Sequence, residues 1–142
     1  MRLLFVLLML IAIPVSAADV GDLVREGEAK LQAGEIDAAA VILERAVELD
    51  ADSALARTRL GGALLLKQDQ PAAIARFRQA IALDARNADA FVGMAVAELH
   101  LGRYSLARAA LEEAKAIAPK KAGEVDSVIA WIDARTAQAA GD

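Results

Sequence analysis

The sequence predicts an all-α protein, an α-solenoid of three helix–turn–helix repeats followed by a C-terminal capping helix. The main observation is internal repetition, because the segment 54–87 resembles both the segment before it, 20–53, and the segment after it, 88–121. Ala73, for example, falls on Ala39 and Ala107. A fixed period of this size is typical of stacked supersecondary units, each of which needs a neighbour to cover its apolar face. The chain is therefore expected to be a short helical array.

Composition supports this fold class and narrows the function. The 142 residues suit one domain, and 57% apolar with 25% charged residues suit a packed globule. Aromatic residues make up only 4%, so strands, which favour aromatic and β-branched side chains, are not expected. The net charge of −4 argues against nucleic acid or an anionic membrane surface as the ligand. The chain has no cysteine, which excludes disulfides, thiol catalysis and iron–sulfur clusters.

At the N-terminus, residues 1–17 have the layout of an export signal. Arg2 supplies the positive start, and Leu3–Ile13 form an uninterrupted apolar run. Because this run is well short of the roughly 20 residues that a membrane-spanning helix needs, the segment is expected to be cleaved after Ala17 or Ala18. An uncleaved signal anchor is the alternative. Cleavage would leave the mature chain in the periplasm, if the host is a bacterium with two membranes.

The remaining residues, 18–142, form one expected domain whose helices follow in order. Apolar residues at helical spacing predict three helix pairs: Val20–Ala33 with Glu35–Asp50, Ala54–Lys67 with Gln70–Asp84, and Ala88–Leu101 with Tyr104–Ala118. The pairs define the repeats 20–53, 54–87 and 88–121. Gly34 and Gly102 are expected to end the first helix of their repeats, and Pro71 fits the first turn of a second helix. Such short connections make neighbouring helices antiparallel.

Residues 122–139 are expected to form the capping helix. The apolar stripe of the first helices continues here, in a fourth unit that has no second helix, through Val125, Val128, Ile129 and Ile132. The opposite side is polar, as the end of a solenoid requires. Trp131 lies at the edge of the stripe, where it either packs against the third repeat or faces a partner.

Signature residues recur at fixed positions in the three repeats. The central repeat has Leu60, Gly61, Ala73, Phe77 and Ala80; the third has Phe91, Gly102, Tyr104, Ala107, Leu111, Ala114 and Pro119; the first has Gly27, Gly34, Ala39, Leu43 and Ala46. In this pattern the chain resembles the tetratricopeptide repeat family, although Glu26 and Ala51 of the first repeat replace the usual Leu and Pro. The resemblance runs through residues 20–121 without an insertion and implies a right-handed α-solenoid.

Small residues are expected where the two helices of a repeat cross. This position holds Gly27, Gly61 and Ala95 in the first helices, and the residues expected to face them from the second helices are Ala39, Ala73 and Ala107. Two backbones approach to about 8 Å only if the side chains at the crossing are small. Phe77, with its counterparts Leu43 and Leu111, is expected to fill the space between adjacent repeats.

The resemblance also implies a concave groove, lined by the first helix of each repeat, that receives an extended peptide or a helix of a partner protein. Carried over by position, the groove residues are Val24, Glu28, Leu55, Thr58, Arg59, Gly62, Leu65, Leu66, Val92, Val96, Leu99 and His100. This mostly apolar set suits an amphipathic helix or a hydrophobic peptide. The alternative is that its Leu and Val residues only pack between helices.

Some members of the family grip a C-terminal carboxylate with a cluster of basic and Asn side chains. The corresponding positions in this chain hold Val24, Glu28, Arg59, Asp89 and Gly93. With one cation among them, this carboxylate clamp is expected to be absent.

Nothing in the sequence indicates catalysis. His100 is the only histidine, and no carboxylate pair at ligand spacing accompanies it, so neither a metal site nor a cofactor is expected. We therefore expect a non-enzymatic adaptor of the bacterial envelope that binds a protein or peptide partner, in the role of an assembly factor for an envelope complex. The alternative is a structural module that forms homo-oligomers through its groove and C-terminal helix.

Overall fold

A computed structural model of the chain describes residues 19–141. The expected export signal, residues 1–17, lies outside the described residues. Within them, no helix combines the length and apolar character that crossing a membrane requires.

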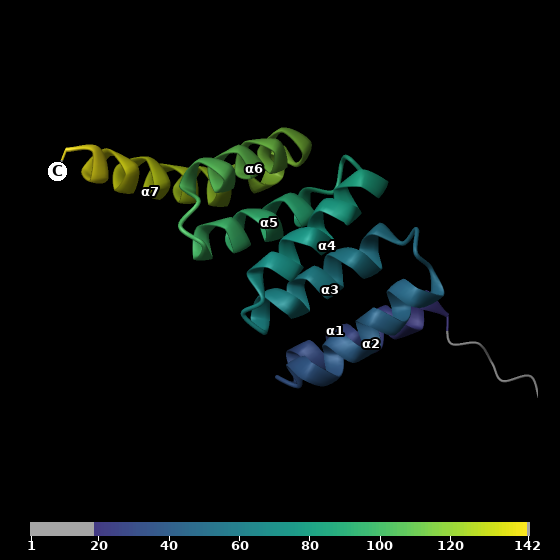
Figure 1. The fold of residues 1–142 in the computed structure, drawn as a ribbon. Coiled ribbons are helices and arrows are strands. Elements are labelled where there is room, and N and C mark those ends of the chain that lie inside the picture. Colours follow the sequence, from purple (N-terminus) through teal and green to yellow (C-terminus); the bar gives the residue numbers. More distant parts are fainter. Residues whose placement is uncertain (1–18, 142) are drawn as a thin grey trace, which may run out of the picture.

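Residues 19–141 form seven α-helices and one short 3-10 helix, without a strand. The helices are α1 (Val20–Gln32), α2 (Ile36–Leu49), α3 (Ala54–Leu66), α4 (Gln70–Leu83), α5 (Ala88–His100), α6 (Tyr104–Ile117), η1 (Pro119–Lys121) and α7 (Ala122–Ala140). The ends expected from the sequence differ from these by at most one residue. Figure 1 shows the helices following one another across the molecule, from α1 and α2 at one end to α7 at the other. The protein is an all-α solenoid of three helix pairs and a capping helix.

Short polar side chains begin the first helix of each pair. Asp19, Ser53 and Asn87 each precede such a helix and accept a hydrogen bond from one of its first backbone N–H groups. The Ser53 bond, from Ala56 N to the side-chain oxygen, is 3.1 Å long. These caps satisfy donors that the helix itself leaves without a partner. They explain why each pair starts where the sequence repeat predicts.

A residue with positive φ ends the first helix of every pair. Gly34 and Gly102 take φ angles of 76° and 69°, which confirms the turns predicted for the first and third repeats. In the central repeat the same place is held by Gln68, with φ at 62°. The sequence predicted no positive φ at this residue, although α4 begins at Gln70 as expected. A residue other than glycine is strained in this left-handed region because of its Cβ atom.

Phe77 is the centre of the packing between the second and third repeats. Its side chain is 2% exposed, and a Cβ atom on Gly61 would lie only 2.7 Å from its ring. A Cβ atom on Gly93, in the next repeat, would also collide with the ring. Phe77 therefore fills the space between adjacent repeats, as expected.

The sequence suggested that alanines of the second helix face the small residues of the first helix. In the structure, larger side chains of the second helix lie nearest to them. The side-chain atoms nearest to Gly61 belong to Phe77, and those nearest to Gly27 belong to Leu43, one helical turn beyond Ala73 and Ala39 respectively. Both alanines are fully buried. At Gly27 and Gly61 glycine is needed because a bulky side chain from the second helix lies against the first helix.

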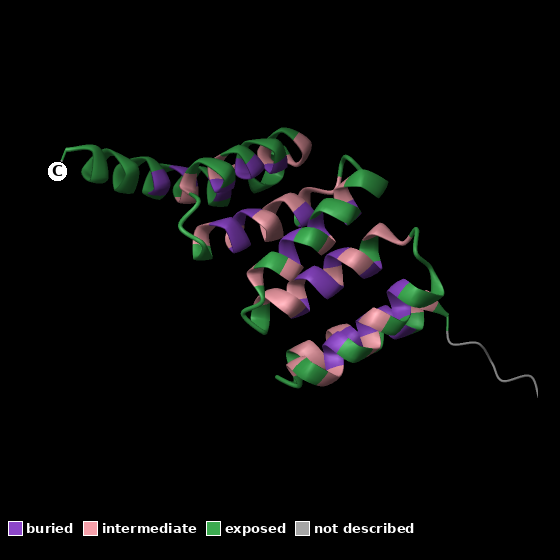
Figure 2. Cartoon of the chain, in the orientation of Figure 1, coloured by how far each residue is buried: buried purple, intermediate pink, exposed green. Residues whose placement is uncertain are grey.

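The backbone of the capping helix α7 packs closely against α6 and lies farther from α5. Ile129 and Ile132 of α7 are buried in one apolar cluster with residues of α5 and α6, including Leu111. The first helices of neighbouring repeats approach one another, α1 to α3 and α3 to α5, but no Cα atom of α7 lies within 8 Å of one in α5. Figure 2 shows the C-terminal half of α7 as exposed on nearly every residue. The stack therefore opens at its C-terminal end.

Polar contacts hold the outer side of α7 to α6. Lys115 Nζ lies 2.6 Å from an oxygen of Asp126, and Arg108 Nε donates to Asp133 at 2.9 Å. Lys115 has its pKa raised, first by the hydrogen bond to Asp126. Together with the buried isoleucines, these pairs fix α7 on one side only.

Trp131 of α7 packs against the third repeat, which is one of the two roles that the sequence left open. Its ring meets that of Tyr104 edge to face, with centroids 6.1 Å apart, and the guanidinium of Arg135 lies 5.6 Å from the Trp131 centroid. Arg135 also donates from Nε to the Tyr104 hydroxyl at 2.7 Å. The tryptophan is nevertheless 51% exposed, so it packs against the third repeat and presents the rest of its surface to solvent.

Candidate functional site

The residues predicted to line the concave groove all lie on the first helices α1, α3 and α5. Leu55 and Leu66 are 50% and 55% exposed, and His100 is also exposed. A second group is partly buried and consists of Glu28, Arg59, Gly62, Leu65, Val92, Val96 and Leu99. These side chains retain surface that a partner can contact.

Val24 and Thr58 have almost no such surface. Val24 is 3% exposed and belongs to an apolar core that the first and second repeats share. Thr58 is 5% exposed, donates to the Ala54 carbonyl at 2.8 Å and accepts from Asn87 Nδ2 at 2.9 Å. It thereby links α3 to the residue that caps α5. The structure corrects these two assignments, because both side chains hold repeats together.

Glu28 and Arg59 form an ion pair between α1 and α3. Their side chains are 36% and 33% exposed, so the pair lies at the surface of the groove. Arg59 was the one strong cation among the predicted groove residues. Because Glu28 neutralises it, little positive charge remains there to attract an acidic ligand.

The predicted residues of α5 border an apolar pocket beneath α7. This α5–α7 pocket has a volume of about 180 Å³. Its lining comprises Val92, Ala95, Val96 and Leu99 of α5, Leu111 of α6, Lys121 of η1, and Glu124, Val125 and Val128 of α7. Val92, Val96 and Leu99 were predicted for the groove, whereas the wall that α7 contributes was not.

The α7 wall escaped prediction because its apolar stripe was assigned entirely to packing. Ile129 occupies the place that Gly61 and Ala95 hold in complete repeats. Its bulk is tolerated because the fourth unit has no second helix to cross α7 at that point, and it does not indicate how far α7 lies from α5. Since α7 stays away from α5, Val125 and Val128 face a cavity between these two helices.

Charged groups lie at one end of the α5–α7 pocket. Lys121 pairs with Asp89 at the start of α5. Glu124 is exposed and takes part in no ion pair among residues 19–141. The floor is therefore apolar, and the rim carries a compensated lysine and a carboxylate.

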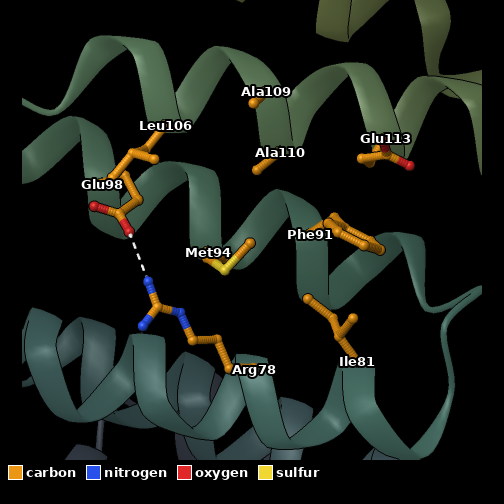
Figure 3. A pocket seen from close by; sticks show the side chains of 9 residues that line it. All are labelled: Arg78, Ile81, Phe91, Met94, Glu98, Leu106, Ala109, Ala110 and Glu113. Atoms are coloured by element: carbon orange, nitrogen blue, oxygen red, sulfur yellow. Dashed lines mark ion pairs between the residues drawn. The ribbon is translucent and has the colours of Figure 1, made fainter.

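A second cavity, the α4–α6 cleft, lies on another face of α5. Its volume is about 330 Å³, and apolar side chains supply most of its lining. Figure 3 shows Met94 and Phe91 of α5 on the floor, Ala109 and Ala110 on the α6 side, and Ile81 on α4. Sequence reasoning did not find this cleft.

Glu98 closes one end of the α4–α6 cleft. Its side chain is 2% exposed, with Arg103 Nη1 3.3 Å from one carboxylate oxygen and Arg78 Nη2 3.9 Å from the other. The dashed line in Figure 3 marks the contact with Arg78. The equivalent position holds Lys30 in the first repeat, Leu64 in the second and Ile132 in α7, so the charge of Glu98 alone did not mark this site in the sequence.

The described residues offer little for chemistry. No group of three or more His, Cys, Asp or Glu side chains within residues 19–141 is arranged to hold a metal ion. Every buried side-chain nitrogen or oxygen in that range has a hydrogen-bond partner. What the arrangement offers is two apolar recesses with charged rims, which suits the binding of side chains.

Solved structures with the same fold extend over most of the chain. The type III secretion chaperone SycD of Yersinia enterocolitica, in complex with a peptide of the translocator YopD, is 16% identical with a TM-score of 0.78; the match covers 87% of this chain and 98% of SycD. The first TPR of Spaghetti (RPAP3), bound to the HSP90 peptide SRMEEVD, is 18% identical with a TM-score of 0.80, covering 88% and 98%. The TPR2B domain of yeast Sti1 is 19% identical with a TM-score of 0.78, covering 82% and 97%.

Family models agree with the fold. Two models described as tetratricopeptide repeat match residues 24–75 and 64–132, which together include parts of all three helix pairs and of α7. No curated protein sequence matches the chain. The helical pairs, their constant spacing in the sequence and these matches show that the chain belongs to the tetratricopeptide repeat family.

Proposed function

We propose that this protein is a non-enzymatic adaptor that binds an apolar segment of a partner protein in its concave groove. The partner segment is an amphipathic helix or a hydrophobic peptide, whose anchor side chain enters the α5–α7 pocket. The protein acts in the bacterial envelope, where it assists the assembly of an envelope complex.

The α5–α7 pocket is the observation that carries the proposal. It joins three of the predicted groove residues, Val92, Val96 and Leu99, to the apolar stripe of α7. Peptide grooves of this kind draw most of their affinity from a few apolar anchors that become fully desolvated. A pocket of about 180 Å³ suits one large aliphatic or aromatic side chain.

The charges of the groove favour an apolar ligand over an acidic one. The peptide SRMEEVD in the Spaghetti complex is acidic. In this chain Arg59 is neutralised by Glu28, and Asp89 takes up the charge of Lys121. An acidic peptide would therefore meet no free cation at these positions, whereas the peptide complex of SycD supports the binding of a protein segment in general terms.

The envelope location rests on the N-terminal segment. The apolar run Leu3–Ile13, which follows Arg2, is shorter than a membrane span, and small residues come after it. Fractionation of cells, with mass spectrometry of the N-terminus, tests this part: a mature chain that begins at Ala18 or Asp19 in the periplasmic fraction supports it. A full-length chain in the cytoplasm contradicts it.

The groove is tested by affinity capture from envelope extract with the wild type and the variants Val96→Asp and Arg59→Glu. Val96→Asp places a charge in the α5–α7 pocket and is expected to lose the partner. The matched control is Val41→Asp, which changes a valine that is 63% exposed on α2. Because Val41 lies outside the groove, this variant should retain the partner. Equal capture by all variants would show that the partner binds elsewhere.

Self-association is a second candidate, favoured by the unpaired end of the solenoid. Residues 133–140 of α7 are exposed, and Trp131 offers half of its surface beside them. A second copy could cover this side of α7 in place of the missing second helix. Light scattering over a range of protein concentrations decides the matter: a concentration-independent monomer would remove this candidate.

A further inference from the structure

The α4–α6 cleft has a counterpart one repeat earlier, between α2 and α4, and the two differ in a specific way. Because the repeats follow one another at a constant spacing, each residue of the cleft has an equivalent in this first groove. The three pairs of equivalents that matter are Arg57 with Phe91, Arg76 with Ala110, and Gln79 with Glu113. Comparing the two grooves shows what the α4–α6 cleft lacks.

In the first groove, two arginines of the chain itself converge on Gln79. Arg57 Nη1 donates to Gln79 Oε1 at 2.7 Å, and Arg76 Nη1 donates to the same oxygen at 3.3 Å. Arg76 also reaches across to α2, where its Nη2 lies 3.2 Å from Glu44 Oε1. Guanidinium groups of the chain therefore occupy this groove.

In the α4–α6 cleft both arginines are absent. Phe91 and Ala110 stand in their places, and a cavity of about 330 Å³ remains. The acceptor is retained and has become a carboxylate, Glu113, which is exposed and forms no ion pair among residues 19–141. The cleft thus keeps the acceptor for a guanidinium but has lost its donors.

The carboxylates at the two ends of the cleft differ in whether they are already paired with a cation of the chain. At one end Glu98 is already paired with Arg78 and Arg103. At the other end, Glu113 of α6 lies near Phe91, and Ile81 of α4 lies beyond that ring, as Figure 3 shows. Only this second end presents a carboxylate that an incoming cation can neutralise, and an aromatic ring close to it favours a planar cation.

We propose that the α4–α6 cleft is a second docking site, which binds a segment of another protein that carries an arginine next to a large apolar side chain. The partner's guanidinium pairs with Glu113 beside the Phe91 ring, in the place that Arg57 and Arg76 fill in the first groove. The apolar side chain enters the cavity over Met94, where Ala109 and Ala110 leave room. Arginine is preferred to lysine because its planar fork matches a carboxylate with two donors.

The site is independent of the proposed groove. Phe91, Met94 and Glu98 line the α4–α6 cleft, whereas other residues of α5, including Val92 and Val96, line the α5–α7 pocket. A protein with both sites can hold two segments at once, and so connect two partners.

The test is a titration of the isotope-labelled protein with the dipeptide Ac-Leu-Arg-NH2, followed by the backbone amide chemical shifts. Saturable shifts are expected at Met94, Ala109, Ala110 and Glu113. Ac-Leu-citrulline-NH2, which has the same shape without the charge, is expected to bind about two- to fivefold more weakly, as for an exposed ion pair. Ac-Leu-Glu-NH2 is expected to produce no saturable shift at these residues.

Two variants distinguish specific binding in the α4–α6 cleft from nonspecific binding. The double variant Phe91→Arg, Ala110→Arg introduces arginines at the positions equivalent to Arg57 and Arg76 and is expected to abolish binding by filling the cleft. Glu113→Lys keeps the cavity and reverses the charge, so it should lose Ac-Leu-Arg-NH2 and bind Ac-Leu-Glu-NH2. Glu48→Lys, at an exposed glutamate of α2, is the control that changes the net charge equally and should bind as the wild type does.

The proposal would be overturned by the absence of saturable shifts with Ac-Leu-Arg-NH2, by equal binding of the arginine and glutamate dipeptides, or by unchanged binding to the double-arginine variant. Shifts confined to Val92, Val96 and Val128 would also overturn it, because they would place the ligand in the α5–α7 pocket. That last result would not contradict the proposed function of the groove. Conversely, capture of the partner by the Val96→Asp variant would contradict the groove function but not the proposed docking site in the α4–α6 cleft.

Discussion

The ring of Phe77 lies against Gly93, so that one side chain of the second repeat occupies the space where a side chain of the third would otherwise stand. The same ring lies against Gly61 of its own repeat. Three helices, α3, α4 and α5, therefore meet at a single aromatic side chain that is almost wholly buried. The junction of the second and third repeats depends on the absence of two Cβ atoms.

Replacing Gly61 by alanine should destabilise the protein. The new Cβ would lie 2.7 Å from Phe77, whose buried ring has no room to move aside, and overpacking of this kind costs about 1–3 kcal/mol. Gly62→Ala is the matched control, because nothing lies within 4 Å of a Cβ atom there. Alanine within a helix is favoured over glycine by about 0.5–1 kcal/mol, so the control should be stabilised. Chemical denaturation of the two variants measures both effects; equal stabilities would contradict this account of the junction.

Truncating Phe77 to alanine should be among the most harmful single changes. Loss of a fully buried aromatic side chain costs about 3–5 kcal/mol, through lost burial and the cavity that remains. The loss is expected to fall on the contact between the second and third repeats. Hydrogen exchange should therefore show faster opening of α4 and α5 than of α1, and uniform acceleration along the chain would argue against such a local role.

Replacing Gln68 by glycine should stabilise the protein. Gln68 has φ at 62°, in the place where Gly34 and Gly102 end the corresponding helices. Relieving a left-handed conformation in a residue with a Cβ gains about 1 kcal/mol, after allowance for the greater freedom of glycine in the unfolded chain. The thermal midpoint of the variant should rise. A lower midpoint would mean that the Gln68 side chain makes contacts worth more than the strain.

Glu98 provides a test of how a buried charge is tolerated. Glu98→Leu introduces the apolar residue type found at Leu64 and should leave stability unchanged or raise it. The reason is that the attraction within a buried ion pair rarely exceeds the free energy needed to desolvate its charges. Arg103→Leu should instead destabilise the protein by about 1–2 kcal/mol, a value reduced from that of a fully buried pair because Arg103 is 55% exposed and Arg78 remains. Urea denaturation ranks the two variants, and the opposite order would contradict the argument.

The contact between Lys115 and Asp126 should make the attachment of α7 sensitive to alkaline pH. The pKa of Lys115 is raised above 10.5, chiefly by its hydrogen bond to Asp126. A group whose pKa is higher in the folded state stabilises that state fully below its unfolded pKa. This contribution is lost as the pH rises through the folded pKa, so α7 should exchange its amide hydrogens faster than α6 above this range once the intrinsic rate is allowed for. Lys115→Met should remove that extra dependence, and an unchanged profile would show that the ion pair does not hold α7.

The repeat pattern made most of the fold predictable. Residues of the same type recur at equivalent positions of the three repeats, so each repeat helps to locate the helices of the others. The ends of the helices were therefore predicted to within one residue. Gln68 was missed because nothing in its side chain indicates a positive φ; only its alignment with Gly34 and Gly102 does. Thr58 was assigned to the groove by position alone, but its side chain is buried and accepts a hydrogen bond from Asn87, the residue that caps α5.

The two cavities were harder to predict because each results from what neighbouring side chains leave empty. The α5–α7 pocket exists because α7 remains apart from α5, which the apolar stripe of Val125, Val128 and Ile132 does not indicate. The α4–α6 cleft depends on the replacement of Arg57 and Arg76 by Phe91 and Ala110. These replacements are visible in the sequence. The hydrogen bonds from Arg57 and Arg76 to Gln79, which show why the replacements matter, are known only from the structure.

Trp131 is the only tryptophan in the chain, and it stands half in water between Tyr104 and Arg135. Its emission under selective excitation therefore comes from a single place, the seam where the last helix meets the body. A shift of that emission to longer wavelength before the circular dichroism changes would report that α7 has come away while the repeats stay folded. The protein thus carries its own optical probe for the opening of its C-terminal end.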